Sequence, residues 1–397
     1  MEGTWFLAAM WIGLALVATL LAIWFRISTA LSEIVVGTVA QLVIGAALGE
    51  ALGGKAPWIT FLAGTGAIVL TFLAGAELDT PVFFARWKEA FAIGLIGFTA
   101  PFLGCAAVAR FVLGWSLRSS WLAGIALSTT SVAVVYAVLL ELGLNKTVYG
   151  KAILAACFVN DLGTVIALGL IFSPFSLRTA VFVGASVAVF AVLPWLTPRF
   201  FRRYGNRPSE LEAKFLLLLL FVMGGLAVWA GSEAVLPAYL IGMVLAGTVG
   251  KDHALIRRLR TLTFGLLTPF YFIRAGSFVS VPALLSAPLV FLALLLAKMA
   301  AKLLGLFPAT KAFRYAGNER TYYTLLMSTG LTFGTISALF GLSHGIIDQR
   351  QYSFLVAAVI ASAVVPTVLA NAFFLPRHLL PGREPAASGV GPDPEEA

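Results

Sequence analysis

The feature that most constrains this chain is a series of long apolar segments that recurs along its whole length. Thirteen segments are long enough, or nearly so, to cross about 30 Å of hydrocarbon. They lie at residues 5–25, 31–48, 58–77, 89–113, 120–142, 151–172, 179–198, 213–230, 234–249, 261–281, 286–306, 321–341 and 351–375. The connections between them are short, and none is long enough for a soluble domain. The pattern therefore predicts an all-α polytopic membrane protein with about 13 transmembrane helices.

Composition supports this class and excludes others. Sixty per cent of the 397 residues are hydrophobic and 11% are charged, which excludes an ordinary soluble domain. The net charge of +9 would suit a nucleic-acid partner, but the basic residues lie between apolar segments and not along one face, so we expect none. Cys105 and Cys157 fall inside apolar segments, which argues against a disulfide framework or a cysteine metal site. We expect no cofactor.

The distribution of lysine and arginine predicts the orientation. If the amino terminus lies outside, nineteen of the 27 basic residues fall in inside segments and five in outside segments. The other three, Arg274, Lys298 and Lys302, fall within apolar segments. Cytoplasmic loops of membrane proteins carry the excess of lysine and arginine. We therefore expect the amino terminus outside, the carboxyl terminus in the cytoplasm, and a disordered cytoplasmic tail at residues 381–397, which are rich in Pro, Gly, Ala and Glu.

A faint internal repeat relates the two halves of the chain. The matching positions are mostly small residues, separated by 200–205 residues: Ala74-Gly75 and Pro81 with Ala275-Gly276 and Pro282, Ser128-Thr129 with Ser328-Thr329, and Leu31 and Gly37 with Leu236 and Gly242. Together they map segments two to six onto segments nine to thirteen. Because the shift of seven is odd, the second copy is inverted, and inverted repeats are common in transporters.

Polar runs interrupt the fifth and twelfth segments at corresponding positions of the two halves. The fifth contains Ser128-Thr129-Thr130-Ser131, and the twelfth contains Ser328-Thr329-Gly330 with Thr332. Hydroxyl residues and glycines allow a membrane helix to unwind where its carbonyls line a cavity. Such residues also serve as packing contacts between membrane helices, so the interpretation depends on the match between the halves. We expect two discontinuous helices.

Ionisable residues deep in two apolar segments indicate a pathway. By helix rise, Asp161 lies about 15 Å from the inner end of its segment and Lys298 about 16–17 Å from the outer end of its own. A charge at the bilayer midplane costs at least about 2.5–3.5 kcal/mol, so such residues usually serve ion, proton or substrate movement. The alternative for Asp161 is a permanently protonated acid inside a helix bundle. Lys302, one turn after Lys298, is interpreted as an anchoring lysine that reaches the inner interface.

Other polar residues receive lesser roles. Asn160 offers donor and acceptor atoms, which would orient the Asp161 carboxylate or supply an amide oxygen to a cation. Arg274 is expected to face the protein interior. A solvated or capping role is expected for the acidic residues nearer segment ends, Glu33, Glu77 and Glu233.

The chain resembles the monovalent cation:proton antiporter superfamily, in particular bacterial sodium/proton exchangers and their potassium-efflux relatives. The resemblance rests on Asn160-Asp161, the Thr-Thr-Ser-Val run at residues 129–132, the LLELGL connection at 139–144 and the lysine of segment eleven, and it extends to about Pro376. It implies a homodimer in a bacterial inner membrane. It also implies one transmembrane unit over residues 1–380, with a dimerisation domain (spans 1–3 and 8–10) and a core domain (spans 4–6 and 11–13).

The resemblance also implies roles for individual residues. Asp161 would bind the cation and the proton in turn, with Asn160, Thr130 and Ser131 beside it, where the core has two crossed, unwound helices. Lys298 would neutralise the crossover. The span-twelve side of the crossover would contain Ser328, Thr329 and Thr332.

The chain departs from the family pattern at two places. Electrogenic members carry a second aspartate where this chain has Asn160, and some relatives carry Arg and Glu where it has Gly330 and Thr332. Lys298 therefore lacks its usual carboxylate partners, and Arg274 adds a further positive charge. The sequence thus leaves open how the core balances its charge.

The expected function is secondary active exchange of a monovalent cation, Na⁺ or K⁺, for H⁺ by alternating access. One carboxylate carries either one proton or one cation, so we expect electroneutral exchange. Three alternatives remain: a channel-like or ligand-gated K⁺ efflux system, a membrane-embedded enzyme, and an anion transporter that uses Arg274, Lys298 and Lys302. The absence of histidine from the apolar segments argues against the enzyme.

Overall fold

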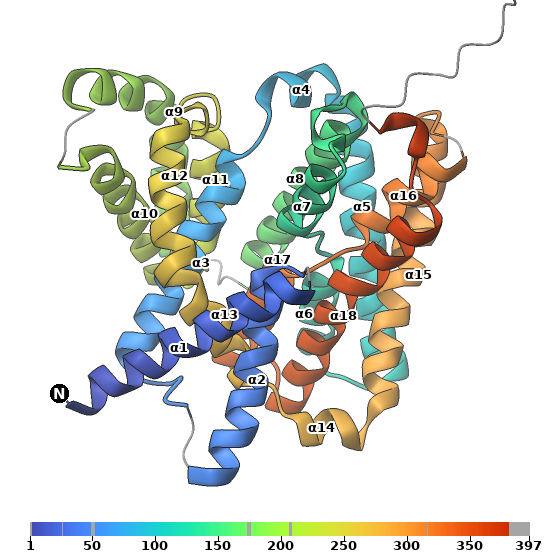
Figure 1. The fold of residues 1–397 in the computed structure, drawn as a ribbon. Helices are drawn as coiled ribbons and strands as arrows, with labels where there is room; N and C mark the ends of the chain where they lie inside the picture. Colours follow the sequence, from blue (N-terminus) through green and yellow to red (C-terminus); the bar gives the residue numbers. More distant parts are fainter. Residues whose placement is uncertain are drawn as a thin grey trace, which may run out of the picture.

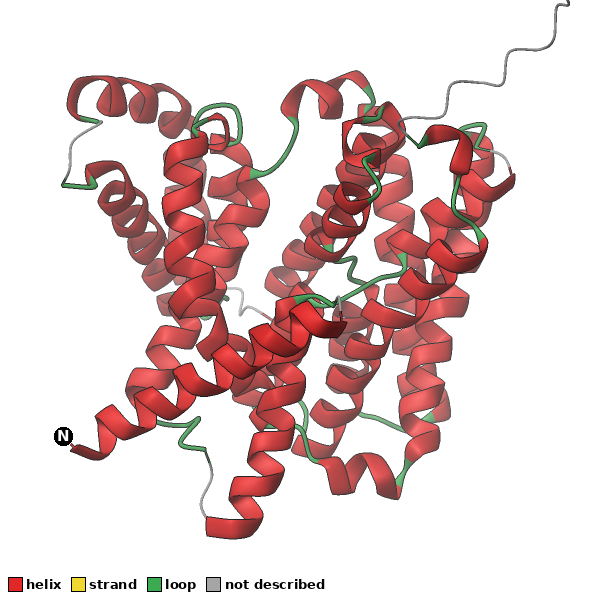
Figure 2. Ribbon diagram, in the orientation of Figure 1, coloured by secondary structure: helices red, strands yellow, loops and turns green. Residues whose placement is uncertain are grey.

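The protein is all-helical in the residues that the structure describes. The computed structural model describes residues 2–25, 27–48, 52–172, 176–205, 209–315 and 317–380, which contain no strand (Figure 2). Within them, ten helices are long and apolar enough to cross a membrane, and two shorter apolar helices lie at Thr29–Ile44 and Val235–Leu245. The predicted fold class is confirmed, whereas the count of thirteen spans stays a prediction. The predicted tail, residues 381–397, lies outside the described residues.

The first half of the chain forms α1 (Glu2–Phe25), α2 (Thr29–Leu48), α3 (Pro57–Ala76), α4 (Thr80–Ala85), α5 (Trp87–Ala107), η1 (Val108–Val112), α6 (Leu117–Ser128), α7 (Val132–Glu141), η2 (Leu144–Lys146) and α8 (Val148–Phe172). The second half forms α9 (Leu177–Tyr204), α10 (Leu211–Trp229), α11 (Val235–Leu245), η3 (Val249–Lys251), α12 (His253–Leu262), η4 (Thr263–Leu267), α13 (Thr268–Ser277), α14 (Val281–Ser286), α15 (Pro288–Ala312), α16 (Gly317–Met327), α17 (Thr332–Ser343), α18 (Gln349–Phe373) and η5 (Arg377–Leu379). Each predicted apolar segment coincides with a helix or with consecutive helices.

The helices gather in two groups that stand side by side (Figure 1). Helices α1–α3 and α10–α13 pack together, with α9 against α10 and α11, and we call them the scaffold group. Helices α5–α8 and α15–α18 form the core group. The short α4 joins the groups at the upper end in Figure 1, where the α7–α8 and α15–α16 connections also lie.

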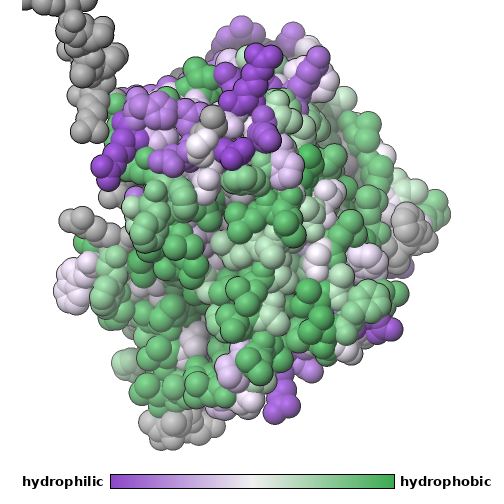
Figure 3. All heavy atoms as spheres, turned by 90° about the vertical axis from the view of Figure 1, so that its right-hand side faces the viewer, coloured by the Kyte–Doolittle hydropathy of each residue, from purple (hydrophilic) through white to green (hydrophobic). Residues whose placement is uncertain are grey.

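Apolar side chains cover much of the outer surface. The face in Figure 3 has a broad hydrophobic zone, with hydrophilic residues gathered along its upper end. Large apolar side chains such as Phe111, Leu289 and Leu304 are about three-quarters or more exposed. A soluble monomer rarely exposes apolar patches of this extent, whereas lipid covers them on a membrane protein.

Two close helix crossings in the scaffold group obey the inverted repeat. Gly37 of α2 and Gly276 of α13 lie against each other's helices, and Gly75 of α3 and Gly242 of α11 do the same. A Cβ atom on any of the four would lie 2.0–2.4 Å from a backbone oxygen of the facing helix, so only glycine permits the approach. The repeat exchanges these contacts, because it matches Gly37 with Gly242 and Gly75 with Gly276. The fold thus contains the repeat that the sequence indicated.

Side-chain caps fix where two core helices begin. The Ser116 hydroxyl accepts a hydrogen bond from the Ser119 amide at the start of α6, and Asp348 and Gln351 form a capping box at the start of α18. The first amides of a helix have no partner within it, so a cap stabilises the start by about 1 kcal/mol. These caps give both helices defined starting points.

Candidate functional site

The core group contains a crossing of two broken helices. Helix α6 gives way to α7 after Ser128, and α16 gives way to α17 after Met327. The backbone amide of Ser131 donates to the carbonyl of Thr329 across the crossing (3.2 Å). The hydroxyl of Thr130 donates to the carbonyl of Met327 (2.7 Å). The prediction of crossed discontinuous helices is therefore confirmed.

The other predicted residues of the span-twelve crossover turn back onto their own segment. The hydroxyls of Ser328 and Thr329 donate to the carbonyls of Thr324 and Leu326, at 2.7 and 2.8 Å. Thr332 is the first residue of α17. Because the last carbonyls of a helix lack partners within it, these hydroxyls stabilise the end of α16. The span-twelve backbone, more than its side chains, faces the other broken helix.

Lys298 of α15 is completely buried and binds the crossing directly. Its Nζ atom donates to the Thr129 carbonyl (3.3 Å) and to the Ser362 hydroxyl (2.9 Å). Gly330 makes room for this ammonium group, since a Cβ there would lie 2.2 Å from Nζ. Cations are stabilised near the carboxyl ends of helices. Lys298 thus lies at the carboxyl end of α6, and its neutralising role stays a prediction.

Lys302 is also completely buried, so its interpretation as an anchoring lysine is wrong. Its Nζ atom donates to the Thr130 hydroxyl (2.9 Å), which in turn donates to the Met327 carbonyl. The error arose from the predicted segment, which ended at residue 306, whereas α15 continues to Ala312. Lys302 therefore lies well inside the helix, too far from its inner end to reach the interface.

Asp161 and Asn160 lie beside the crossing on the unbroken helix α8, and both are buried. In the described part of the chain, both polar atoms of the Asn160 amide and Oδ1 of Asp161 have no hydrogen-bond partner. The positive charges nearest in effect to the Asp161 carboxylate are those of Lys302, which is the stronger, and Lys298. The backbone N–H of Thr130 also faces this carboxylate. Buried polar atoms are nearly always paired with protein, water or an ion. These atoms are therefore suited to bind a ligand.

The donor set at this site is chemically specific. A carboxylate and an amide oxygen are hard ligands, which favour alkali and alkaline-earth cations over soft transition metals. Among the described residues, no group of three or more His, Cys, Asp or Glu side chains is placed to hold a metal ion. The one carboxylate also accepts a proton in place of a cation. The arrangement is therefore suited to a weakly held cation in competition with H⁺.

The structure does not bring Arg274 to Lys298. Its Nε atom donates to the Gly54 carbonyl (2.7 Å), and its side chain lines a pocket of about 340 Å³ that also contains Glu233 and His344. Burial raises the pKa of Glu233, and the nearby His344 partly opposes this. Because the three basic residues do not converge on one site, the structure disfavours the anion-transport hypothesis.

The other two acidic residues differ from each other. Glu77 forms the C-cap of α3 and pairs with Arg260, in agreement with its expected role at a helix end. Glu33, in contrast, is only 2% exposed, so a solvated role is wrong for it. It lies in the first turns of α2, where the neighbouring scaffold helices cover it.

Two further residues of the site were missed by the sequence analysis. Tyr239 of α11 donates its hydroxyl to the Phe158 carbonyl (3.0 Å), one turn before Asp161, and packs edge-on against Phe333. It therefore joins the scaffold group to the core group near the depth of Asp161. Ser362 of α18 holds Lys298. The only signals were a tyrosine and a serine in apolar segments, which are too common to single them out.

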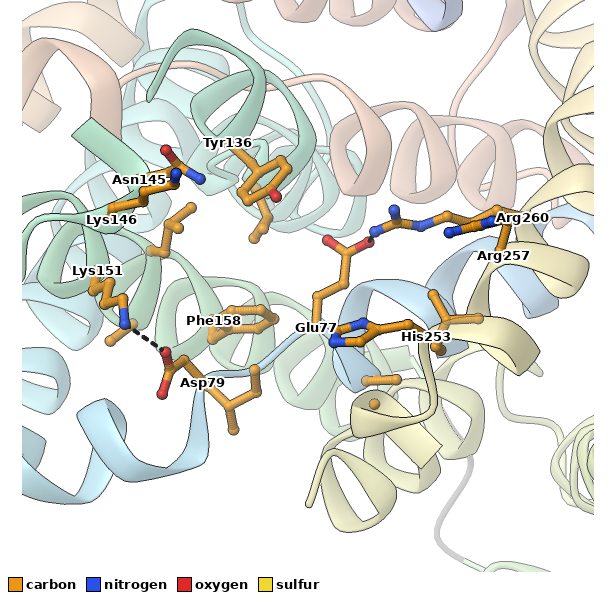
Figure 4. A pocket seen from close by; sticks show the side chains of 17 residues that line it. Glu77, Asp79, Tyr136, Asn145, Lys146, Lys151, Phe158, His253, Arg257 and Arg260 are labelled. Atoms are coloured by element: carbon orange, nitrogen blue, oxygen red, sulfur yellow. Dashed lines mark hydrogen bonds and ion pairs between the residues drawn. The ribbon is translucent and has the colours of Figure 1, made fainter. Parts of the chain in front are cut away.

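Two pockets lead toward the site from opposite ends of α3. A cavity of about 610 Å³ lies between the groups and is lined by Ala76 at the end of α3 and by Phe158 (Figure 4). The 340 Å³ pocket is lined by Thr60 at the start of α3. Asp161 itself is only 1% exposed. Asp161 lines neither pocket, so the site is closed from both in this structure.

Comparisons with known proteins agree with this architecture. The family model described as sodium/hydrogen exchanger, transmembrane, matches residues 12–374. The probable Na(+)/H(+) antiporter 3 of Methanocaldococcus jannaschii is 24% identical over 330 residues, which cover 79% of this chain and 84% of that protein. The Na(+)/H(+)-K(+) antiporter GerN of Bacillus cereus is 25% identical over 356 residues, which cover 84% of this chain and 89% of that protein.

A solved structure has a similar fold. The sodium proton antiporter MjNhaP1 from Methanocaldococcus jannaschii, at pH 8, superimposes with a TM-score of 0.69 at 16% identity. The match covers 94% of this chain and 97% of that one. Since the family model spans almost the whole transmembrane region and the crossed helices lie where the family resemblance placed them, the chain belongs to the transmembrane sodium/hydrogen exchanger family.

Proposed function

We propose that this protein exchanges a monovalent cation, Na⁺ or K⁺, for protons across a bacterial inner membrane. The observation that carries the proposal is the buried Asp161 carboxylate, which lies beside the unpartnered Asn160 amide at a crossing of two broken helices. The similarity to a probable Na⁺/H⁺ antiporter and to a Na⁺/H⁺-K⁺ antiporter supports it.

Competition for one carboxylate accounts for exchange. When Asp161 is ionised, its oxygens and the Asn160 amide oxygen bind the cation. When Asp161 is protonated, one of its oxygens holds the proton and the carboxyl group is neutral, so the cation leaves. In the structure, Lys298 and Lys302 donate hydrogen bonds to the broken helix formed by α6 and α7. They lower the cost of holding an ionised carboxylate in the membrane, because an opposite charge nearby favours the charged form.

Alternating access requires the core group to move against the scaffold group. The two pockets lie between these groups at opposite ends of α3. The Tyr239–Phe158 hydrogen bond joins the groups between the pockets, so it must break and re-form in each cycle. We expect the scaffold group to serve as the dimerisation domain. We also expect the cavity in Figure 4 to open to the cytoplasm, because its basic lining residues belong to the inside segments that carry the excess of lysine and arginine.

Asp161→Asn tests this function. An amide neither takes up nor releases a proton at physiological pH, so the variant is expected to lose cation-dependent proton flux completely. Purified protein in proteoliposomes with a pH-sensitive dye is exposed in turn to the chloride salts of Na⁺, K⁺, Li⁺ and choline. The parent responds to at least one metal cation and not to choline.

Folding is the control for this experiment. The variant must elute as a single species at the parent's position in size-exclusion chromatography. Cation-dependent flux in a well-folded Asp161→Asn protein would show that another group carries the proton. Flux in the parent that follows chloride and not the cation would instead support anion transport.

A further inference from the structure

The cavity in Figure 4 carries more positive than negative charge. Its charged lining comprises four basic side chains and two carboxylates: Lys146, Lys151, Arg257, Arg260, Glu77 and Asp79. The ring of His253 also lines it. The formal excess is two positive charges when this histidine is neutral. A wall of this sign repels a cation that approaches the exchange site.

Ion pairs leave two of the basic residues uncompensated. Glu77 pairs with Arg260, and Asp79 pairs with Lys151 (3.2 Å). Both carboxylates of the cavity are therefore already engaged. Among the described residues, Lys146 and Arg257 form no ion pair within 4.0 Å, which leaves the excess charge on them.

The two uncompensated residues belong to different helix groups. Arg257 extends from α12 of the scaffold group, and Lys146 extends from η2 of the core group on the other side of the cavity (Figure 4). An anion between them would therefore contact both groups. Opposite charges in a partly enclosed, low-dielectric cavity attract more strongly than on an open surface.

Neutral donors complete the surroundings. The hydroxyl-bearing ring of Tyr136 and the amide of Asn145 line the cavity beside Lys146. The Asn145 oxygen is buried without a hydrogen-bond partner in the described structure. Because the two ends of an amide exchange places on a flip of the side chain, the NH₂ group can take that position and donate to an anion. The volume of about 610 Å³ falls within the range of about 300–1,000 Å³ that is usual for small-molecule sites.

We propose that this cavity binds a small phosphate-bearing anion, which bridges Arg257 and Lys146 and thereby inhibits exchange. Phosphate oxygens match both partners, because arginine binds them in a bidentate manner and lysine as a point charge. The bound anion holds the scaffold and core groups together and occupies the route to Asp161. Binding is independent of the proposed exchange function, and only the inhibition rests on it.

Binding is tested first, on detergent-purified protein by isothermal titration calorimetry. The probes are Tris salts of inorganic phosphate, pyrophosphate and ATP, so that no transported metal cation is added. We expect saturable binding of at least one probe, weakened by added choline chloride because salt screens the attraction. Equal affinity for pyrophosphate and ATP assigns the site to the phosphate groups alone, whereas tighter ATP binding assigns part of it to a nucleoside. Absence of binding by all three probes at millimolar concentration would overturn the proposal.

A double substitution locates the site. Arg257→Gln with Lys146→Gln is expected to weaken binding at least about tenfold, since each removes a charge-assisted hydrogen bond. Arg258→Gln is the matched control, because Arg258 neighbours Arg257 but pairs with Glu210 (3.0 Å) and does not line the cavity. The control should bind as the parent does. Undiminished binding by the double variant, or an equal loss in the control, would show that the anion binds elsewhere.

Inhibition is then measured in inside-out membrane vesicles, in which the cavity faces the added solution. The probe that binds most tightly should slow cation-driven proton flux in the parent and in Arg258→Gln, but not in the double variant. Binding without any inhibition would refute the regulatory part of the proposal, while the anion-binding site itself would stand. If the parent shows no flux without the probe, the exchange function fails and the calorimetric result still stands.

Discussion

Gly330→Ala probes the most crowded point of the crossing. The new Cβ atom would lie 2.2 Å from Lys298 Nζ, 2.9 Å from Thr129 Oγ1 and 3.2 Å from the Thr129 carbonyl oxygen. Because ordinary contacts of this kind are about 3.4–4 Å, the ammonium group must move by more than about 1 Å. That movement breaks its bonds to Thr129 and Ser362, which are 3.3 and 2.9 Å long.

The cost follows from those two bonds. Each hydrogen bond to a charged group contributes about 1.5–3 kcal/mol, and the displaced charge has no water to receive it. We therefore expect a loss of roughly 3 kcal/mol or more, seen as a fall in Tm of at least about 5 °C in detergent, with a thermal-shift dye or by circular dichroism.

Two further variants test whether the clash with Lys298 causes the loss of stability. Gly64→Ala is the matched control, since no atom lies within 4 Å of a Cβ at that glycine of α3, and its Tm should not fall. Lys298→Met removes the atom that Gly330→Ala displaces. If the clash is the cause, Gly330→Ala adds little to Lys298→Met. Additive losses, or a Gly330→Ala protein as stable as the parent, would contradict the geometry.

Three other predictions concern the titration of Glu233, the orientation in the membrane and the stoichiometry of exchange. Burial raises the pKa of Glu233, so the folded protein binds a proton more readily than the unfolded chain. The free energy of unfolding therefore falls as the pH rises above the ordinary pKa of a carboxyl group. Glu233→Gln should raise Tm at pH 8 but not at pH 4, and an equal change at both pH values would exclude this titration as the cause. With Cys105 and Cys157 replaced, an impermeant maleimide should label Lys55→Cys and Lys311→Cys from opposite sides of the membrane, and labelling from one side would contradict the proposed orientation. With one titrating carboxylate, Na⁺-driven proton flux in proteoliposomes clamped with K⁺ and valinomycin should not vary with voltage once proton leak is subtracted, whereas flux that scales with voltage would show that a buried lysine also releases a proton.

The sequence predicted the features that are arranged along the chain. The length of the apolar segments indicated membrane helices, because each residue of a helix adds about 1.5 Å. The two polar runs indicated where the helices break, since Thr129–Ser131 and Ser328–Leu331 are the non-helical stretches of the structure. Depth in the apolar segments singled out Asp161 and Lys298, and the family resemblance then implied their roles at the crossing. Each of these inferences needs only local sequence or a recognisable motif.

Tertiary structure decided which buried polar groups meet. Lys302 looked like an interfacial lysine because hydropathy suggested an early end to its helix, and packing against Thr130 shows its actual place. The partners of these lysines come from helices far away in the chain, such as Ser362 of α18.

Tertiary packing also creates the charged cavity. Arg257 and Lys146 are separated by more than one hundred residues and line one cavity only because α12 and η2 stand on its opposite sides. In the sequence both residues counted only toward the positive charge of inside segments. Hydropathy indicates the depth of a residue in the membrane. The direction of its side chain depends on how the helices pack around it, and this packing determined which residues meet at the site.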